Sequence, residues 1–395
     1  MNDRDVLFLG GVRTAIGKFG GALKDLTAVE LGAVAVKGAL ERTGAPPEAF
    51  DQGFVGHARQ AGNGPNPGRL VALRGGLPAS CPVCTIQQAC VSGMQALLLA
   101  GQAIRLGEAD LVMVAGTEHM SGIPFLSPDT RWGARMGDAR LLDAMYKDGF
   151  IDPITGKHMG ELTEEMAERR GITRVAQDEY ALMSQQRAEE AKKTGFTART
   201  VVPVEITQRK GSVLVQEDEH PRPDTSLEKL AALPAAFKPN GTVTAGNASG
   251  ITDGAVALVL ASRARARELG LSGVARLKAG AVAAVEPKDF ALAPVPATQK
   301  ALARAGLSLR DVGVVEINEA FAAMVLAVMS ELDLTMDKVN LYGGAIAYGH
   351  PVGISGARIV LSLLEIMREK GLGLGLATIC GNGGNGGAVV LQLEA

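Results

Sequence analysis

Residues 343–358 read GGAIAYGHPVGISGAR, and this is the most informative stretch of the chain. One histidine, His350, stands between a glycine-rich approach and a glycine-rich segment that opens a helix. Glycines on both sides allow a tight turn and the close approach of a ligand, and Pro351 stiffens the turn. The chain has five histidines, and none of the others is framed in this way. The pattern predicts a catalytic histidine, provided that the chain supplies partners for it.

The chain contains an internal repeat, in which this stretch is the later copy of an earlier segment. Ser355-Gly356 opens a predicted helix in the second half, as Ser92-Gly93 does in the first half. Two further pairs keep the same order at a nearly constant offset: a helix end at 39–44 with 301–306, and a strand end at 114–116 with 379–381. Three ordered matches favour a duplicated α/β unit over a chance similarity between alanine-rich helices.

The composition predicts a large buried core built from small side chains. Of the 395 residues, 47% are hydrophobic but only 4% are aromatic, and 50 are glycine. Such a chain is long enough for two or three domains, and its composition favours closely packed α/β layers. The 40 basic and 42 acidic residues leave a net charge of −2. We therefore expect neither a nucleic-acid groove nor a basic membrane patch.

The cysteine count and the ends of the chain bear on the cellular compartment. Four cysteines in a chain of this length form no disulfide framework, and they fit a reducing compartment. The apolar run in MNDRDVLFLGG is too short for a secretory signal, and no run approaches the roughly 18 apolar residues of a membrane span. The terminal QLEA is no address signal. We expect a cytoplasmic protein without a membrane segment.

Apolar runs and helical periodicity predict the core elements, and a different composition marks an insertion. We expect first-half strands at 5–10, 50–56, 82–87 and 109–116, a further strand at 251–262, and helices at 28–42 and 90–106. Between about 120 and 247, prolines recur and the predicted helices, at 163–170 and 175–194, are charged and amphipathic. This segment is interpreted as an inserted loop domain with a lid or binding function. A plain second domain is the alternative.

Two cysteines stand where chemistry is possible. Cys90 lies at the predicted start of a helix, where free N–H groups and the helix dipole favour a thiolate that can attack a carbonyl. Cys380 ends an apolar strand and enters a glycine-rich turn, where a second thiol can move a proton. The alternative for each is a small buried hydrophobic residue.

Polar residues elsewhere give weaker signals. Asn318 follows a predicted strand, where its amide can orient a water or an oxyanion, or cap the next helix. Cys81 and Cys84 have the CxxC spacing of a redox pair or half a zinc site. No second CxxC or nearby histidine completes a metal set, so we expect no metal.

The cysteine at a helix start, the histidine in GHP, the second cysteine before a glycine run and the Asn318-Glu319-Ala320-Phe321 element together resemble the thiolase family over essentially the whole chain. The resemblance implies two equivalent βαβαβαββ halves that form a five-layered αβαβα core with an inserted loop domain. The corresponding divisions are 1–119 with 250–272 for the first half, 120–249 for the loop domain and 273–395 for the second half.

The resemblance also assigns functions to individual residues. Cys90 would be the nucleophile that takes the acyl group, and His350 would activate it and help to bind the thioester oxygen of the incoming acetyl-CoA. Asn318 would hold a water in that first oxyanion hole. Cys380 would exchange the α-proton of acetyl-CoA. The backbone N–H groups of Cys90 and Asn382 would form the second oxyanion hole.

Further residues match the family's coenzyme A contacts. They are His158, Met159, Arg222, Phe237 and Ser249, and an arginine among them suits the CoA phosphates. Other positions depart from the family pattern, and they leave the acyl-chain specificity open: Met94, Thr117, His119, Tyr348 and Asn382. For Asn382, a left-handed backbone would be strained.

As a member of this family, the chain would be an acetyl-CoA C-acetyltransferase of biosynthetic type. It would condense two acetyl-CoA to acetoacetyl-CoA in a ping-pong reaction and run the reverse thiolysis. A broader 3-ketoacyl-CoA thiolase of β-oxidation is the alternative, and a non-catalytic CoA-binding scaffold is a third reading. CoA thioesters would be substrates, with no permanently bound cofactor. The loop near 124–137 resembles a tetramerisation loop, which implies a homotetramer, a dimer of dimers, or at least a homodimer.

Overall fold

Each half of the chain folds into one sheet, and the two sheets join along a single pair of strands. The computed structural model describes residues 2–209 and 211–394. The strand order in the first half is β4 (Val83–Ile86), β3 (Gln52–Gly56), β5 (Leu111–His119), β11 (Thr252–Ser262) and β1 (Val6–Thr14). From the junction onward, the order in the second half is β12 (Ala275–Ala284), β15 (Asn385–Leu393), β14 (Leu374–Gly381) and β13 (Val314–Ile317).

The strand pairing of one half repeats in the other. β3 runs parallel to β5, and β13 runs parallel to β14. β4 is also parallel to β3. The pairs in the series β5, β11, β1 and in the matching series β14, β15, β12 are antiparallel. At the junction, Leu7 lies opposite Arg276 and Phe8 opposite Ala275. The repeated pairing agrees with the duplication that the sequence predicts.

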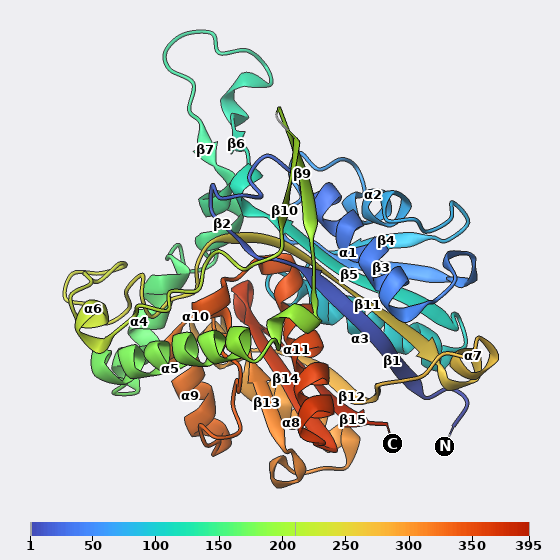
Figure 1. The fold of residues 1–395 in the computed structure, drawn as a ribbon. Coiled ribbons are helices and arrows are strands. Elements are labelled where there is room, and N and C mark those ends of the chain that lie inside the picture. The colour runs from blue at the N-terminus through green and yellow to red at the C-terminus, as the bar shows by residue number, and fades with distance from the viewer. Residues whose placement is uncertain (1, 210, 395) are drawn as a thin grey trace.

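Helices cover both sheets and fill the space between them, which gives five layers (Figure 1). α1 (Ala28–Thr43) and α2 (Pro67–Arg74) pack on the first sheet, and α8 (Pro294–Ala305) and α9 (Ala322–Leu332) pack on the second. Between the sheets lie α3 (Ser92–Leu106) and α11 (Ser355–Lys370). Separate apolar clusters occupy the two outer faces and the central layer. The expected αβαβα core is confirmed.

Local sequence signals explain why equivalent helices begin and end where they do. Thr27 caps α1 by accepting the backbone N–H of Glu30, whose carboxylate accepts the backbone N–H of Thr27. The left-handed Gly44, with φ of 68°, ends α1, and the left-handed Gly306, with φ of 67°, ends the equivalent α8. The repeated Ala-Leu-x-Arg-x-Gly pattern is therefore a repeated helix stop.

The two central helices meet at their glycine-containing N-terminal ends. A Cβ built on Gly93 would lie 3.0 Å from the backbone nitrogen of Ala357, and one built on Gly356 would lie 2.6 Å from that of Met94. These contacts leave no room for larger side chains. They bring the segment that follows Cys90 against the segment that follows His350.

The insertion between β5 and β11 lies over the core and extends away from it. It contains α4 (Met159–Arg169), α5 (Arg174–Lys193), α6 (Leu227–Ala231) and the hairpin β9 (Val204–Gln208) with β10 (Gly211–Val215). A second hairpin, β6 (Phe125–Leu126) with β7 (Leu142–Asp143), projects from the body of the molecule (Figure 1). The remaining short elements are β2 (Gly17–Lys18), β8 (Val201–Val202), α7 (Arg263–Glu268) and α10 (Ala345–Tyr348).

One described segment has the length and mean hydropathy of a membrane span, although Gln95, Gln102 and Arg105 interrupt its apolar run. Ala89–Leu106 has a mean hydropathy of 1.2, but 61% of it is buried inside the molecule, where it forms the turn before α3 and α3 itself. Its apolar character reflects its place between two sheets.

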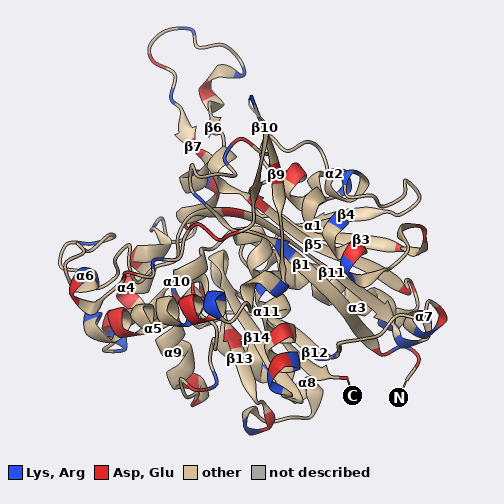
Figure 2. Cartoon of the chain, viewed as in Figure 1, with Lys and Arg blue, Asp and Glu red and all other residues tan. Residues whose placement is uncertain are grey.

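Figure 2 shows charged residues of both signs interspersed over the outer helices and loops.

Candidate active site

Cys90 lies in a tight turn between β4 and α3, two residues before the helix begins. Ala89 has a positive φ of 48°, which costs a non-glycine residue about 1–2 kcal/mol. Side-chain bonds hold the turn, because Ser92 Oγ donates to the carbonyl of Ala89 at 2.6 Å and accepts the N–H of Gln88 at 2.8 Å. The expected position of Cys90 in the first helical turn was therefore wrong. The structure places it on a strained bend, where the residue as a whole is half-buried.

The electrostatics of Cys90 also differ from the expectation of a stabilised thiolate. Burial raises the pKa of the Cys90 thiol above its usual range. The positive charge of Arg59 and the backbone N–H groups of Asn382 and Cys90 oppose this effect without reversing it. The resting residue is a thiol, because the loss of water around the sulfur outweighs the nearby positive charge. A base is needed to activate it.

His350 is held as a neutral imidazole with a defined tautomer. Its Nδ1 lies 2.6 Å from Ser355 Oγ, and Ser355 Oγ donates to the carbonyl of Pro351 at 3.0 Å. Because the single hydroxyl proton is used on Pro351, Nδ1 must carry a proton and donate it to Ser355. Nε2 is then unprotonated, and it is buried without a hydrogen-bond partner among the described residues. Burial lowers the pKa of His350 to about 3, and the charges of Arg358 and Arg59 contribute in the same direction.

The turns that carry the two candidate catalytic groups pack against each other. Cys90 packs on an apolar group that includes Ala58 and Val352, and Val352 follows His350 by two positions. The neighbouring Gly353 carbonyl would lie 2.9 Å from a Cβ on Gly93. The structure therefore brings Cys90 and His350 to one site from equivalent helix openings of the two halves.

Cys380 ends β14 beside the turn of Cys90. A Cβ built on the next residue, Gly381, would lie 3.0 Å from the side chain of Val91. Burial raises the pKa of the Cys380 thiol well above its usual range, and the nearby Cys90 raises it further. The Cys380 thiol donates to Met324 Sδ at 3.3 Å. The two cysteines of the two halves thus face one site, and both are thiols at rest.

Asn318 lies directly after β13, with both amide atoms buried and without a hydrogen-bond partner among the described residues. The helix that follows begins at Ala322 and its N-cap residue is Phe321, so the alternative of Asn318 as a helix cap was wrong. The adjacent Glu319 accepts the backbone N–H of Ile346 at 3.0 Å. This contact ties the Asn318 segment to the stretch that carries His350.

Asn382 lies in the turn between β14 and β15, and its backbone N–H faces the sulfur of Cys90. Its side chain donates to the carbonyl of Gly149 at 2.7 Å. The left-handed conformations in this turn belong to Gly383 and Gly384, with φ of 77° and 81°. The expected strain at Asn382 was therefore wrong, since the glycines adopt the backbone that an asparagine would resist.

Glu118 joins the segment after β3 to the turn that follows His350, and sequence reasoning missed it. Its carboxylate accepts the N–H groups of Ala58 and Arg59, each at 3.1 Å, and that of Gly353 at 2.7 Å. Its Oε1 lies 3.3 Å from His57 Nε2. Burial alone would raise the pKa of Glu118, but the hydrogen bond and charge of His57, together with Arg59, hold it lower than usual. A buried carboxylate at the end of β5 could have been suspected from the charge in an apolar strand.

Four of the five expected CoA contacts lie near one another. His158 stacks on Phe237 with ring centroids 4.7 Å apart, and Phe237 meets Phe321 edge-on at 6.1 Å. Met159 follows His158 as the first residue of α4. The N–H of Ser249 donates to the carbonyl of Ala320, next to Phe321, at 3.0 Å. These residues form a half-buried aromatic wall around the Asn318 segment.

Arg222 lies apart from the contacts of that wall. Its backbone N–H donates to Gln185 on α5 at 2.8 Å, and its side chain is exposed. An exposed guanidinium at this position suits a phosphate group.

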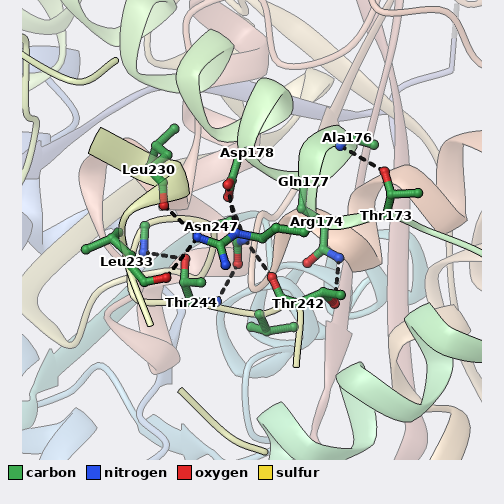
Figure 3. Close-up of polar contacts among 12 residues, drawn as sticks. Thr173, Arg174, Ala176, Gln177, Asp178, Leu230, Leu233, Thr242, Thr244 and Asn247 are labelled. Atoms are coloured by element: carbon green, nitrogen blue, oxygen red, sulfur yellow. Dashed lines mark hydrogen bonds and ion pairs between the residues drawn. The ribbon is translucent and has the colours of Figure 1, made fainter. Parts of the chain in front are cut away.

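A polar network fixes the segment that leads to Ser249 (Figure 3). Asn247 donates to Asp178 on α5 at 2.9 Å and to the carbonyl of Thr242 at 3.0 Å. Its own carbonyl accepts the N–H of Ala322, the first residue of α9, at 2.9 Å. Arg174 pairs with Asp178 at 2.7 Å. The network therefore fastens the insertion to the helix that follows Asn318.

Most positions that depart from the family pattern have a structural role. Thr117 Oγ1 donates to the carbonyl of Ala28, and His119 Nε2 lies 3.2 Å from the carbonyl oxygen of Leu23. Tyr348 donates to the carbonyl of Tyr342 at 2.9 Å and is buried. It packs in a separate cluster with Ile16, Ala188 and Ala347.

The CxxC pair has no metal-binding surroundings among the described residues. Cys81 is buried, and Cys84 is exposed on β4. The part of the chain that the structure describes contains no group of three or more His, Cys, Asp or Glu side chains that could hold a metal ion.

Comparisons with known proteins identify the family. Residues 6–264 match the model of the thiolase N-terminal domain, and residues 271–393 match that of the thiolase C-terminal domain. The chain therefore belongs to the thiolase family.

Relatives and solved structures agree with that assignment. The chain is 47% identical to an acetyl-CoA acetyltransferase of Cupriavidus necator, over 98% of this chain and 99% of the relative. It is 46% identical to a probable acetyl-CoA acetyltransferase of Escherichia coli K12, over 99% and 100%. Its fold matches the crystal structure of the Bacillus anthracis acetyl-CoA acetyltransferase, with a TM-score of 0.96 and 42% identity over 99% of both chains. The human mitochondrial 3-ketoacyl-CoA thiolase gives a TM-score of 0.96 at 39% identity, over 99% of this chain and 100% of that chain.

Proposed function

We propose that this chain transfers acyl groups between CoA thioesters, and that its main reaction condenses two acetyl-CoA to acetoacetyl-CoA and CoA, with the reverse thiolysis. The observation that carries the proposal is the meeting of two thiols and one neutral, buried imidazole at a site built from both halves. Relatives of 46–47% identity that are named as acetyl-CoA acetyltransferases support the acetyl substrate.

In the first step, Cys90 takes the acyl group. Its sulfur attacks the thioester carbonyl while His350 Nε2 accepts the thiol proton, since Nε2 is the unprotonated nitrogen. The developing oxyanion is stabilised by the backbone N–H groups of Cys90 and Asn382, which both face the Cys90 sulfur. The CoA sulfur leaves and takes the proton from His350. The products are acyl-Cys90 and free CoA.

In the second step, His350 Nε2 takes the thiol proton of Cys380, and the Cys380 sulfur then accepts the proton that leaves the α-carbon of acetyl-CoA. The protonated His350 and a water held by the unpartnered amide of Asn318 stabilise the enolate oxygen. The α-carbon forms a bond to the carbonyl of acetyl-Cys90, the carbon–sulfur bond breaks, and the Cys90 sulfur takes the proton from His350. In thiolysis the steps reverse, and the Cys380 thiol protonates the departing carbanion. A raised pKa keeps Cys380 in the protonated form that this step requires.

The insertion supplies the CoA-binding surface of the proposed enzyme. We assign 1–119 with 250–272 to the first half, 120–249 to the loop domain and 273–395 to the second half. His158, Phe237 and Ser249 would line the pantetheine channel with Met159, and Arg222 would contact a phosphate. No permanently bound cofactor is needed for these steps, and the compartment proposed is the cytoplasm.

The projecting β6–β7 hairpin supports a proposed homotetramer, a dimer of dimers. Trp132 is 93% exposed and Met136 is 97% exposed, and large apolar side chains at such exposure are typical of interaction sites. A second copy of the chain is the occupant expected.

A series of thiolysis rates on 3-ketoacyl-CoA substrates of increasing chain length tests the substrate. We expect acetoacetyl-CoA to give the highest kcat/KM, with a steep fall as the chain lengthens. Comparable rates on long chains would establish the broader thiolase of β-oxidation instead. Cys90→Ala should abolish transfer and condensation together, and unchanged activity would refute the proposed covalent step.

A further inference from the structure

Arg59 places a buried positive charge beside the reactive cysteine, and the mechanism above does not use it. It follows β3 by three positions, at the carboxyl edge of the parallel strands, where α/β proteins bind ligands. The residue is 9% exposed. Its backbone N–H donates to Glu118 at 3.1 Å, and its positive charge acts on the Cys90 thiol.

The side chain of Arg59 lines a pocket that begins at the acyl-accepting turn. The pocket has a volume of about 850 Å³ and is walled on one side by Gln88, Ala89 and Asn382. Further lining residues include Gln60 and Gln87. The pocket is also lined by apolar side chains, among them Ile123, Ile151 and Ile154, and the amide and guanidinium groups supply its polar part.

A short series of contacts connects the guanidinium to the Cys90 sulfur. A Cβ built on Gly149 would lie 2.5 Å from Arg59 Nη2, so the guanidinium lies directly against the Gly149 backbone. The carbonyl of Gly149 accepts the Asn382 side chain at 2.7 Å. The Asn382 backbone N–H in turn faces the sulfur of Cys90. Arg59 therefore lies within reach of a short group attached to that sulfur.

The guanidinium of Arg59 is unpaired within the described part of the chain. Among residues 2–209 and 211–394 the Arg59 side chain makes no hydrogen bond or salt bridge, and its Nε is buried without a partner. The carboxylate of Glu118, whose pKa the Arg59 charge helps to lower, accepts three backbone N–H groups. Two carboxylates also line the pocket: Asp148, and Asp152, whose Oδ1 accepts the N–H groups of Ile154 and Thr155 at 3.1 Å and 2.8 Å and whose Oδ2 is buried without a hydrogen-bond partner among the described residues. A buried arginine without a partner is rare in proteins, and it is suited to an anionic ligand.

We propose that Arg59 determines acyl specificity by binding the terminal carboxylate of a short dicarboxylic acyl group, such as succinyl, that is carried on Cys90. This inference rests on the proposed acyl transfer and extends its substrate class. Succinyl moves from CoA to the Cys90 sulfur with release of CoA as the thiol. The α-carbon of acetyl-CoA then forms a bond to the succinyl carbonyl as it loses its proton. The Cys90 sulfur leaves with a proton, and the product is a 3-oxo dicarboxylic acid held as a mono-CoA thioester.

The test compares kcat/KM for succinyl-CoA and for acetyl-CoA as acyl donors in wild type, Arg59→Leu and Arg59→Lys. Arg59→Leu should lower the succinyl-to-acetyl ratio by about 10- to 100-fold, as expected for lost hydrogen bonds between charged groups. Arg59→Lys should lie in between, because an ammonium keeps the charge without the paired donors. The ratio is used because loss of Arg59 also changes the Cys90 thiol, and that effect is common to both donors.

Lys147→Gln is the matched control, since Lys147 is an exposed cation on the same pocket. It should change the ratio less than Arg59→Leu does. An unchanged ratio in Arg59→Leu, or an equal loss in Lys147→Gln, would overturn the proposal. Mass spectrometry of the wild type separates two kinds of failure. An acetyl adduct without a succinyl adduct on Cys90 refutes this inference alone, whereas the absence of both adducts refutes the acyl transfer itself.

Discussion

Ser355 fixes the tautomer of His350, and its removal gives a quantitative test of the proposed base. In the structure Ser355 Oγ accepts the Nδ1 proton at 2.6 Å and donates to the carbonyl of Pro351 at 3.0 Å. The residue is fully buried in the first turn of α11. Ser355→Ala therefore leaves the Nδ1–H donor without a partner in a region from which water is excluded.

The size of the effect follows from the cost of leaving a buried donor unsatisfied. That cost is about 1–3 kcal/mol, and each 1.4 kcal/mol corresponds to about a tenfold change. The imidazole can escape part of the cost by moving its proton to Nε2, which removes the base that Cys90 needs. We therefore expect kcat for thiolysis to fall by about 10- to 100-fold. KM should change little, because Ser355 is not among the residues proposed to contact substrate.

The assay is steady-state thiolysis of acetoacetyl-CoA, together with the rate at which acetyl-CoA labels Cys90. Ser355→Thr keeps the hydroxyl and should recover most of the activity, after its thermal stability has been checked for the added methyl group. Ser362→Ala, the same change on the same helix, is the control and should have nearly wild-type rates. Full activity in Ser355→Ala would refute the assignment of Nε2 as the base.

Further predictions concern acid stability and assembly. Burial holds the pKa of His350 at about 3, below its ordinary 6.5, so the folded state binds fewer protons and loses stability as the pH falls from about 6.5 toward 3. In urea unfolding, the free energy of unfolding of the wild type minus that of His350→Gln should therefore fall by about 2 kcal/mol between pH 7 and pH 5. A difference that stays constant would contradict the cited burial effect. Replacing both Trp132 and Met136 by Ser should shift the light-scattering mass from tetramer to dimer without unfolding the subunit. An unchanged tetramer would show that the exposed hairpin is not the contact.

Much of the architecture could be predicted because it depends on short-range patterns. The two helix stops at Gly44 and Gly306 have nearly the same φ, and their matching sequence motifs revealed the duplication. Continuous apolar runs predicted the buried strands, because small side chains are needed between closely spaced layers. The thiolase fold and family followed from motifs and are confirmed by the comparisons.

The chemistry of the site was harder to predict because it depends on burial and on long-range contacts. A helix start next to Cys90 suggested a stabilised thiolate, but the desolvation of the sulfur is set by loops far away in the sequence. The roles of Glu118 and Ser355 are visible only when separate turns meet. For Arg59, a charged residue just after a predicted strand was a signal that could have been noticed. The assigned functions of the individual site residues remain predictions.

In the proposed mechanism, the Cys90 thiol carries the acyl group and the Cys380 thiol transfers the proton. Peptide mass spectrometry of Cys380→Ala after incubation with acetyl-CoA tests both roles in one experiment, with acetoacetyl-CoA formation followed in the same sample. We predict an acetyl group on Cys90 and no condensation product, because the acceptor forms while the proton transfer is lost. An unlabelled Cys90, or normal condensation by this variant, would contradict the account.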